Sequence, residues 1–71
     1  MKTFNNIKQL RWERGISLRD LASASGVSYT TISKIENGDT TPTQITMMKI
    51  SQGLKMKTEN VFNLDWENNN V

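Results

Sequence analysis

Residues 18–38 read LRDLASASGVSYTTISKIENG, and this stretch decides the fold of the chain. Apolar residues recur on both sides of Gly26 at the three- and four-residue spacing of one face of an α-helix. Glycine enters a left-handed turn at the least conformational cost, so Gly26 is the natural place for the chain to reverse. The stretch therefore predicts two short helices joined by a tight turn.

The ends of both helices carry capping signals. Ser17 and Asp20 form a capping box at the start of the first helix, and Ser28 caps the second. Val27 is placed to pack against the entry of the second helix, and Gly38 follows its end. These signals are local, and they predict a pair of helices that start near Ser17 and Ser28 to within about two to four residues.

Two further helices are expected near the two ends of the chain. The first should run from residue 4 to 14, with Phe4, Ile7 and Leu10 facing inward and Gly15 ending it. A short helix over residues 58–62 should close the domain with Val61 and Phe62. No strand-like alternation exceeds four residues, so the pattern predicts an all-α domain.

One more helix is expected after the glycine at residue 38. Thr41 can cap it, Pro42 suits the first helical position, and Gln44 completes a capping box. Its core face would consist of Met47, Met48, Ile50, Ser51 and Leu54. The chain then forms a compact unit of five short helices with short connections.

The composition excludes several classes of protein. Seventy-one residues make one small domain, which we place at residues 1–63, followed by an acidic, Asn-rich tail at 64–71. The chain has no cysteine and no histidine, so we expect no disulfide, metal site or cofactor. Without the usual general base, we do not expect an enzyme.

The charge is unevenly distributed. Residues 1–57 hold all nine Lys and Arg against four acids, a net charge of +5, whereas the last fourteen residues carry −3. A basic body with an acidic tail suits a surface that faces phosphate, although ordinary solvated charges would give the same distribution. No apolar run approaches the roughly 18 residues of a membrane span, and no signal peptide is visible. We expect no membrane contact and a cytoplasmic location.

The central stretch resembles the helix-turn-helix of the Cro/cI-like regulators of bacteria and phages, the xenobiotic-response-element family. The matching residues are 21–22, 26–28, 32–33 and 35–38, and the resemblance extends over about residues 5–62. It implies the five-helix fold of these repressors and a transcription regulator, bacterial or phage-encoded, that binds double-stranded DNA. In such a fold the second helix of the pair lies in the major groove.

The resemblance also implies roles for individual residues. The base-contacting positions of the family correspond to Tyr29, Thr30 and Lys34. The phosphate-contacting positions correspond to Ser17, Ser28, Thr31 and Asn37. To them we add Ser33, which faces outward on the same helix, and Arg19, which stands next to Leu18 and could supply a cation there. Hydroxyl, amide and cationic side chains of this length suit base edges and phosphates. A polar helix face is also what plain solvation would produce.

One basic and one acidic residue form a structural ion pair in similar phage repressors. There, an arginine of the first helix pairs with the glutamate of the Ile-Glu-Asn-Gly ending. Arg11 and Glu36 occupy these positions. The chain departs from the family at Leu18, where a phosphate-binding Gln is usual. It departs again at Gly53, which replaces a usual Ala and should weaken its helix by about 1 kcal/mol, and at Lys55, which replaces a usual Gly.

The C-terminal part suggests a homodimer, the usual assembly of this architecture. The contact would use Val61, Phe62, Leu64 and Trp66, and would place the two DNA-contacting helices about 34 Å apart on a pseudo-palindromic site. Alternatively, the tail folds back and Trp66 covers the first helix near Trp12. A different class of function stays open as well: an antitoxin or adaptor that binds a regulatory protein partner through Trp12, Trp66 and the tail.

Overall fold

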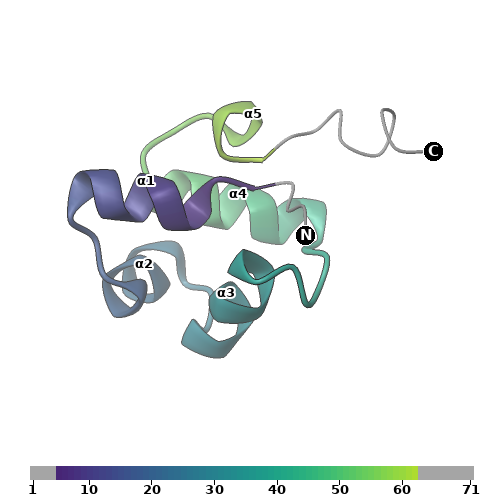
Figure 1. Ribbon diagram of the computed structural model, residues 1–71. Helices are drawn as coiled ribbons and strands as arrows, with labels where there is room; N and C mark the ends of the chain where they lie inside the picture. The colour runs from purple at the N-terminus through teal and green to yellow at the C-terminus, as the bar shows by residue number, and fades with distance from the viewer. Residues whose placement is uncertain (1–4, 63–71) are drawn as a thin grey trace.

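The computed structural model describes residues 5–62 of the chain. Helices in this part, labelled in Figure 1, are α1 (Ile7–Arg14), α2 (Leu18–Ser25), α3 (Tyr29–Glu36), α4 (Gln44–Gly53) and α5 (Thr58–Val61). α1 and α4 form the middle of the domain, with α2 and α3 on one side of them and α5 on the other (Figure 1). The predicted all-α, five-helix architecture is confirmed.

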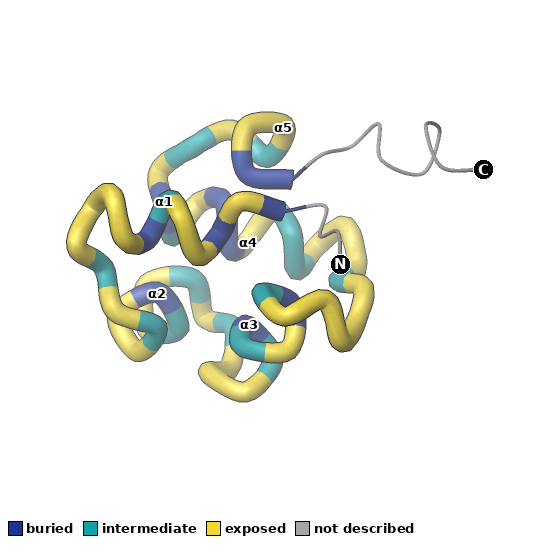
Figure 2. The backbone as a smooth tube through the Cα atoms, viewed as in Figure 1, coloured by how far each residue is buried: buried dark blue, intermediate teal, exposed yellow. Residues whose placement is uncertain are grey.

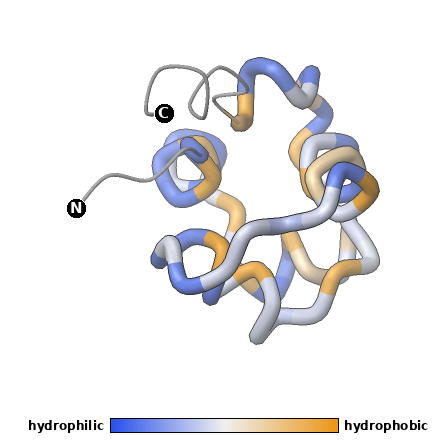
Figure 3. The backbone as a smooth tube through the Cα atoms, turned by 90° about the vertical axis from the view of Figure 1, so that its right-hand side faces the viewer, coloured by the Kyte–Doolittle hydropathy of each residue, from blue (hydrophilic) through white to orange (hydrophobic). Residues whose placement is uncertain are grey.

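Eight apolar side chains form a single core that every helix supplies. Each is at most 2% exposed: Ile7, Leu21, Ile32, Ile35, Ile50, Leu54, Val61 and Phe62. Buried positions recur on the inward side of each helix (Figure 2), and hydrophobic positions alternate with hydrophilic ones along the tube (Figure 3). This periodicity makes each short helix amphipathic, so that its apolar side packs against its neighbours.

None of the helices in residues 5–62 has the length and apolar character that a membrane span requires.

The start of α1 differs from the prediction. The helix begins at Ile7, and Phe4 lies outside the described residues. The Ile7 amide donates to Asn5 Oδ1 at 3.1 Å, and Asn5 Nδ2 donates to the carbonyl of Ile35 at 3.0 Å. Asn5 therefore satisfies a free amide of α1 and a free carbonyl at the end of α3 at the same time.

The start of α4 was predicted wrongly. Thr43, not Thr41, is the N-cap, and its hydroxyl accepts from the Thr46 amide at 3.2 Å. Both threonines can cap a helix, but the chain needs the residues through Pro42 to cross from α3 to α4. Met48, which we expected in the core, is 47% exposed on the outer side of α4.

Gly53 has a packing role that the sequence did not indicate. A Cβ at this position would lie 3.0 Å from the Cβ of Ser25 and 3.1 Å from its amide nitrogen. Both distances are shorter than ordinary van der Waals contact. The glycine thus lets α4 approach the end of α2 closely, and this approach offsets part of its low helix propensity.

Candidate nucleic-acid interface

The α2–turn–α3 unit is held by local hydrogen bonds at both helix starts. The Asp20 amide donates to Ser17 Oγ at 3.0 Å and the Ser17 amide to Asp20 Oδ2 at 3.3 Å, which completes the predicted capping box. Gly26 has φ +74°, the left-handed conformation that the turn needs. The Thr31 amide donates to Ser28 Oγ at 3.1 Å. α3 therefore leaves the turn in a fixed direction.

The inner and outer faces of α3 differ sharply. Ile32 and Ile35 are fully buried, which fixes the rotation of the helix about its axis. The predicted base-contacting residues, Tyr29, Thr30 and Lys34, are all exposed on the opposite face. That face projects away from α1 and α4 (Figure 2), so a ligand can reach it without any rearrangement of the core.

The predicted phosphate-contacting residues are distributed around this face. Four of them are exposed and two are half-buried: Ser17, Arg19, Ser28 and Asn37 in the first group, Thr31 and Ser33 in the second. Ser28 Oγ also donates to Thr31 Oγ1 at 2.7 Å, so these two hydroxyls act as a linked pair at the start of α3. Arg19 of α2 lies over the ring of Tyr29 of α3, with its guanidinium carbon 5.7 Å from the ring centroid.

Arg11 and Glu36 form an ion pair between α1 and the end of α3. Arg11 Nε lies 2.7 Å from Glu36 Oε2, and Nη2 donates to Oε1 at 3.2 Å. Arg11 Nη1 also donates to the Ile16 carbonyl at 3.1 Å. The two side chains are only 10% and 6% exposed, so the bidentate pair joins three segments of the chain inside the fold.

The electrostatic balance of the surface follows from these pairings. The two acids within residues 18–38 already have partners: Asp20 in the capping box and Glu36 with Arg11. Arg19 and Lys34 have no carboxylate within salt-bridge distance among residues 5–62. The outer surface of α3 therefore presents a cation and hydrogen-bonding groups, with its own acid neutralised by Arg11, whereas Asp20 keeps its negative charge at the exposed start of α2.

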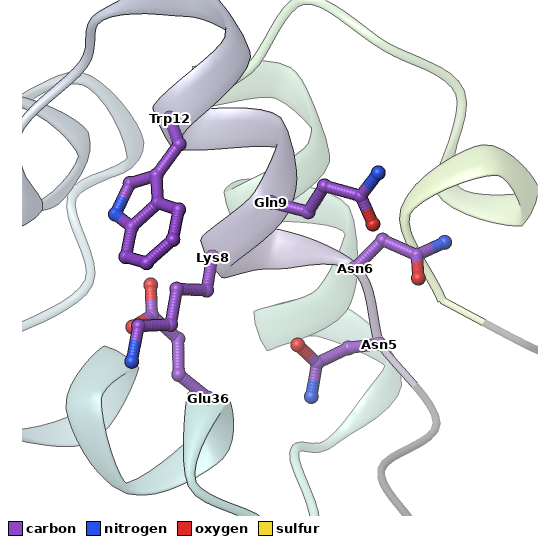
Figure 4. Close-up of a pocket in the computed structure, with 6 residues that line it drawn as sticks. All are labelled: Asn5, Asn6, Lys8, Gln9, Trp12 and Glu36. Atoms are coloured by element: carbon purple, nitrogen blue, oxygen red, sulfur yellow. The ribbon is translucent and has the colours of Figure 1, made fainter.

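A second exposed feature lies along α1. A groove of about 400 Å³ is lined by Asn5, Asn6, Lys8, Gln9, Trp12 and Glu36 (Figure 4). Trp12 is 70% exposed, and Lys8 Nζ lies 5.4 Å from its ring centroid. The suggested covering of Trp12 by Trp66 concerns a residue outside the described range.

Part of the predicted dimer contact has to be corrected. Val61 and Phe62 are 0% and 1% exposed because both side chains complete the core of a single chain. The Asn6 amide donates to the Val61 carbonyl at 2.8 Å, which holds this segment against the start of α1. These two residues therefore offer no side chain to a second copy. Leu64 and Trp66 lie outside the described residues.

The helix pair, its glycine turn and the exposed polar face of α3 define a helix-turn-helix domain of the DNA-binding class. The chain belongs to the helix-turn-helix family HTH_3, whose model matches residues 7–61. It is 39% identical over 64 residues to the uncharacterized HTH-type transcriptional regulator YgzD of Bacillus subtilis, an alignment that covers 90% of this chain and 97% of YgzD.

Two longer proteins contain a similar domain. The HTH-type transcriptional regulator SutR of Escherichia coli is 46% identical over 50 residues, which are 70% of this chain and 28% of SutR. The crystal structure of an HTH_3 family transcriptional regulator from Vibrio cholerae superposes with a TM-score of 0.75 at 38% identity, covering 86% of this chain and 34% of that one. The chain is accordingly a transcriptional regulator with a helix-turn-helix DNA-binding domain, and not an enzyme.

Proposed function

We propose that this protein is a repressor that binds a pseudo-palindromic operator in double-stranded DNA as a homodimer and inserts α3 into the major groove. The observation that carries the proposal is the outer face of α3, which is exposed, polar and free of unpaired acid. A helix of this kind fits the major groove, where each base pair presents a distinct pattern of donors and acceptors.

Base recognition falls to the exposed side chains of α3. Lys34 can donate to O6 or N7 of guanine, and Thr30 can hydrogen-bond to a base or contact a thymine methyl group. The phosphates on either side of the groove can be bound by hydroxyl, amide and guanidinium groups around α3. These belong to Ser17, Ser28, Thr31, Ser33, Asn37 and Arg19. Contacts to phosphate would set the register of the domain on the duplex, and contacts to base edges would select the sequence.

The proposed dimer needs apolar groups outside the core of one chain. Ile45 and Met48 of α4 are 66% and 47% exposed, and their three-residue spacing places them on one face of the helix. Together with Leu64 and Trp66 they could bury apolar area between two copies. A two-fold axis at this contact would present two α3 helices to half-sites about 34 Å apart. Repression would then follow from occlusion of a promoter that contains the operator.

The test is selection of bound sequences from a random pool of DNA duplexes. We expect enrichment of a site with two inverted halves separated by one helical turn, and a dissociation constant that rises steeply with salt. Each neutralised phosphate should add about −0.9 to the slope of the logarithm of the association constant against the logarithm of the salt concentration. A single enriched half-site would refute the dimer, and the absence of enrichment at low salt would refute the whole proposal.

A second candidate function rests on the groove along α1. An aromatic side chain that is 70% exposed beside a cation suits a protein contact better than plain solvation. In an antitoxin or adaptor, a regulatory protein partner would cover Trp12 there. This candidate predicts that Trp12→Ala abolishes regulation in cells and leaves binding of the selected duplex unchanged. Weakened duplex binding by this variant would exclude it.

A further inference from the structure

The contact between Arg19 and Tyr29 joins the two helices of the DNA-binding unit at their outer surface. The guanidinium carbon lies 5.7 Å from the ring centroid, within the range of a cation–π interaction. Arg19 is exposed and Tyr29 is 51% exposed, so the pair is accessible from outside. No carboxylate of residues 5–62 forms a salt bridge with Arg19, so its charge is available to a ligand.

The contact between the two side chains determines which of their groups remain available to a ligand. The guanidinium lies over one face of the Tyr29 ring, and the phenolic hydroxyl at the edge of the ring stays available to a ligand. A guanidinium attracted to the face of a ring keeps its N–H donors available to a ligand. The two residues together therefore present a guanidinium and a hydroxyl next to each other on the outer surface.

The position of the pair favours phosphate over a base edge as the ligand. Arg19 comes from α2, and the first helix of a helix-turn-helix crosses the DNA backbone while the second enters the groove. Tyr29 is the first residue of α3, and its ring lies beneath the guanidinium of Arg19 from α2. A guanidinium fork with an adjacent hydroxyl matches the oxygens of a phosphodiester.

We infer that Arg19 and Tyr29 act as one phosphate clamp, so that Tyr29 anchors the domain on the DNA backbone instead of selecting bases. This inference rests on the proposed function, because it presupposes binding of a duplex. It changes the role that the family resemblance implied for Tyr29 and leaves base selection in this part of α3 to Thr30 and Lys34.

The experiment measures dissociation constants for the selected duplex and for duplexes with one base pair changed. Arg19→Gln should weaken all of them by the same factor, about tenfold, and lower the salt slope by about one. Tyr29→Leu should also act equally on all duplexes. In the Tyr29→Leu background, Arg19→Gln should have an effect two- to fivefold smaller than in the wild type, because the stacking is already lost. Lys57→Gln, next to α5 on the far side of the domain (Figure 1), is the matched charge control.

The outcomes separate this inference from the proposed function. The clamp would be overturned if Tyr29→Leu changed the preference for one base pair. It would also be overturned if the double variant raised the dissociation constant by the product of the two single factors. In either case DNA binding itself would stand. Failure of the wild type to bind any duplex would overturn both. Thermal unfolding of each variant, followed by circular dichroism, should stay at the wild-type temperature because both side chains are exposed.

Discussion

Breaking the Arg11–Glu36 pair should be among the most damaging single changes to this domain. This charge pair is largely withdrawn from water, because its two side chains are at most 10% exposed. The Arg11 Nε to Glu36 Oε2 distance is 2.7 Å, and a second hydrogen bond joins the same two groups. Removing one partner of a buried pair strands the other charge at a cost of about 3–5 kcal/mol. A domain of this size has a free energy of unfolding of roughly 4–10 kcal/mol, on the basis of ~0.05–0.15 kcal/mol per residue.

We therefore expect Glu36→Gln and Arg11→Met each to lower the free energy of unfolding by about 3 kcal/mol. Arg11→Met also removes the donor to the Ile16 carbonyl. The double variant Arg11→Met with Glu36→Met should recover most of this loss, because an apolar pair leaves no buried charge. Urea unfolding followed by far-UV circular dichroism measures all four proteins.

The matched control is Glu13→Gln on the exposed face of α1, where Glu13 accepts a hydrogen bond from Gln9. The same chemical change there should cost less than about 0.5 kcal/mol. The reasoning is refuted if both single variants at the buried pair cost under about 1 kcal/mol, or if the double variant costs their sum.

The remaining predictions concern one cap, one strained residue and two contacts to DNA. Thr43→Ala should lower the free energy of unfolding by about 1 kcal/mol, and Thr41→Ala by much less, in urea titrations; equal losses would contradict the cap assignment. Lys55 has φ +58°, so Lys55→Gly should raise the stability by about 0.5–1 kcal/mol, and a fall would show that strain is absent. Lys34→Ala should reduce discrimination at particular base pairs by ~1–3 kcal/mol in competition binding. Asn37→Ala should weaken all duplexes alike, and a sequence-dependent loss would reassign it to base contact.

Features that depend on neighbours in the chain could be predicted from the sequence. The Ser17–Asp20 capping box, the left-handed Gly26 and the Ser28 cap all involve residues at most three positions apart. Such interactions form in almost any surroundings, because the helix itself brings the groups together. The choice between Thr41 and Thr43 as a cap was beyond this reasoning, since it depends on how much chain is needed to reach α4.

Features that depend on distant segments could not be predicted in the same way. Asn5 bonds to the carbonyl of a residue thirty positions away, and no local pattern marks it as the link between α1 and α3. The sequence marks Gly53 only as a weak position in its helix, because the close approach of Ser25 is a tertiary contact. Val61 and Phe62 were expected both in the core and at a dimer contact, and only their burial decides between these two places.

The amino-acid sequence by itself determined the helix pair, its turn and the polar character of α3, because periodicity and capping act over one or two turns of chain. The tertiary structure alone decided which polar groups are free to meet a ligand. Packing places Arg19 over the ring of Tyr29 and leaves Lys34 without a carboxylate partner among residues 5–62, and it buries the Arg11–Glu36 pair that the family resemblance implied. The physical reason is that the availability of a charge depends on what the fold places beside it.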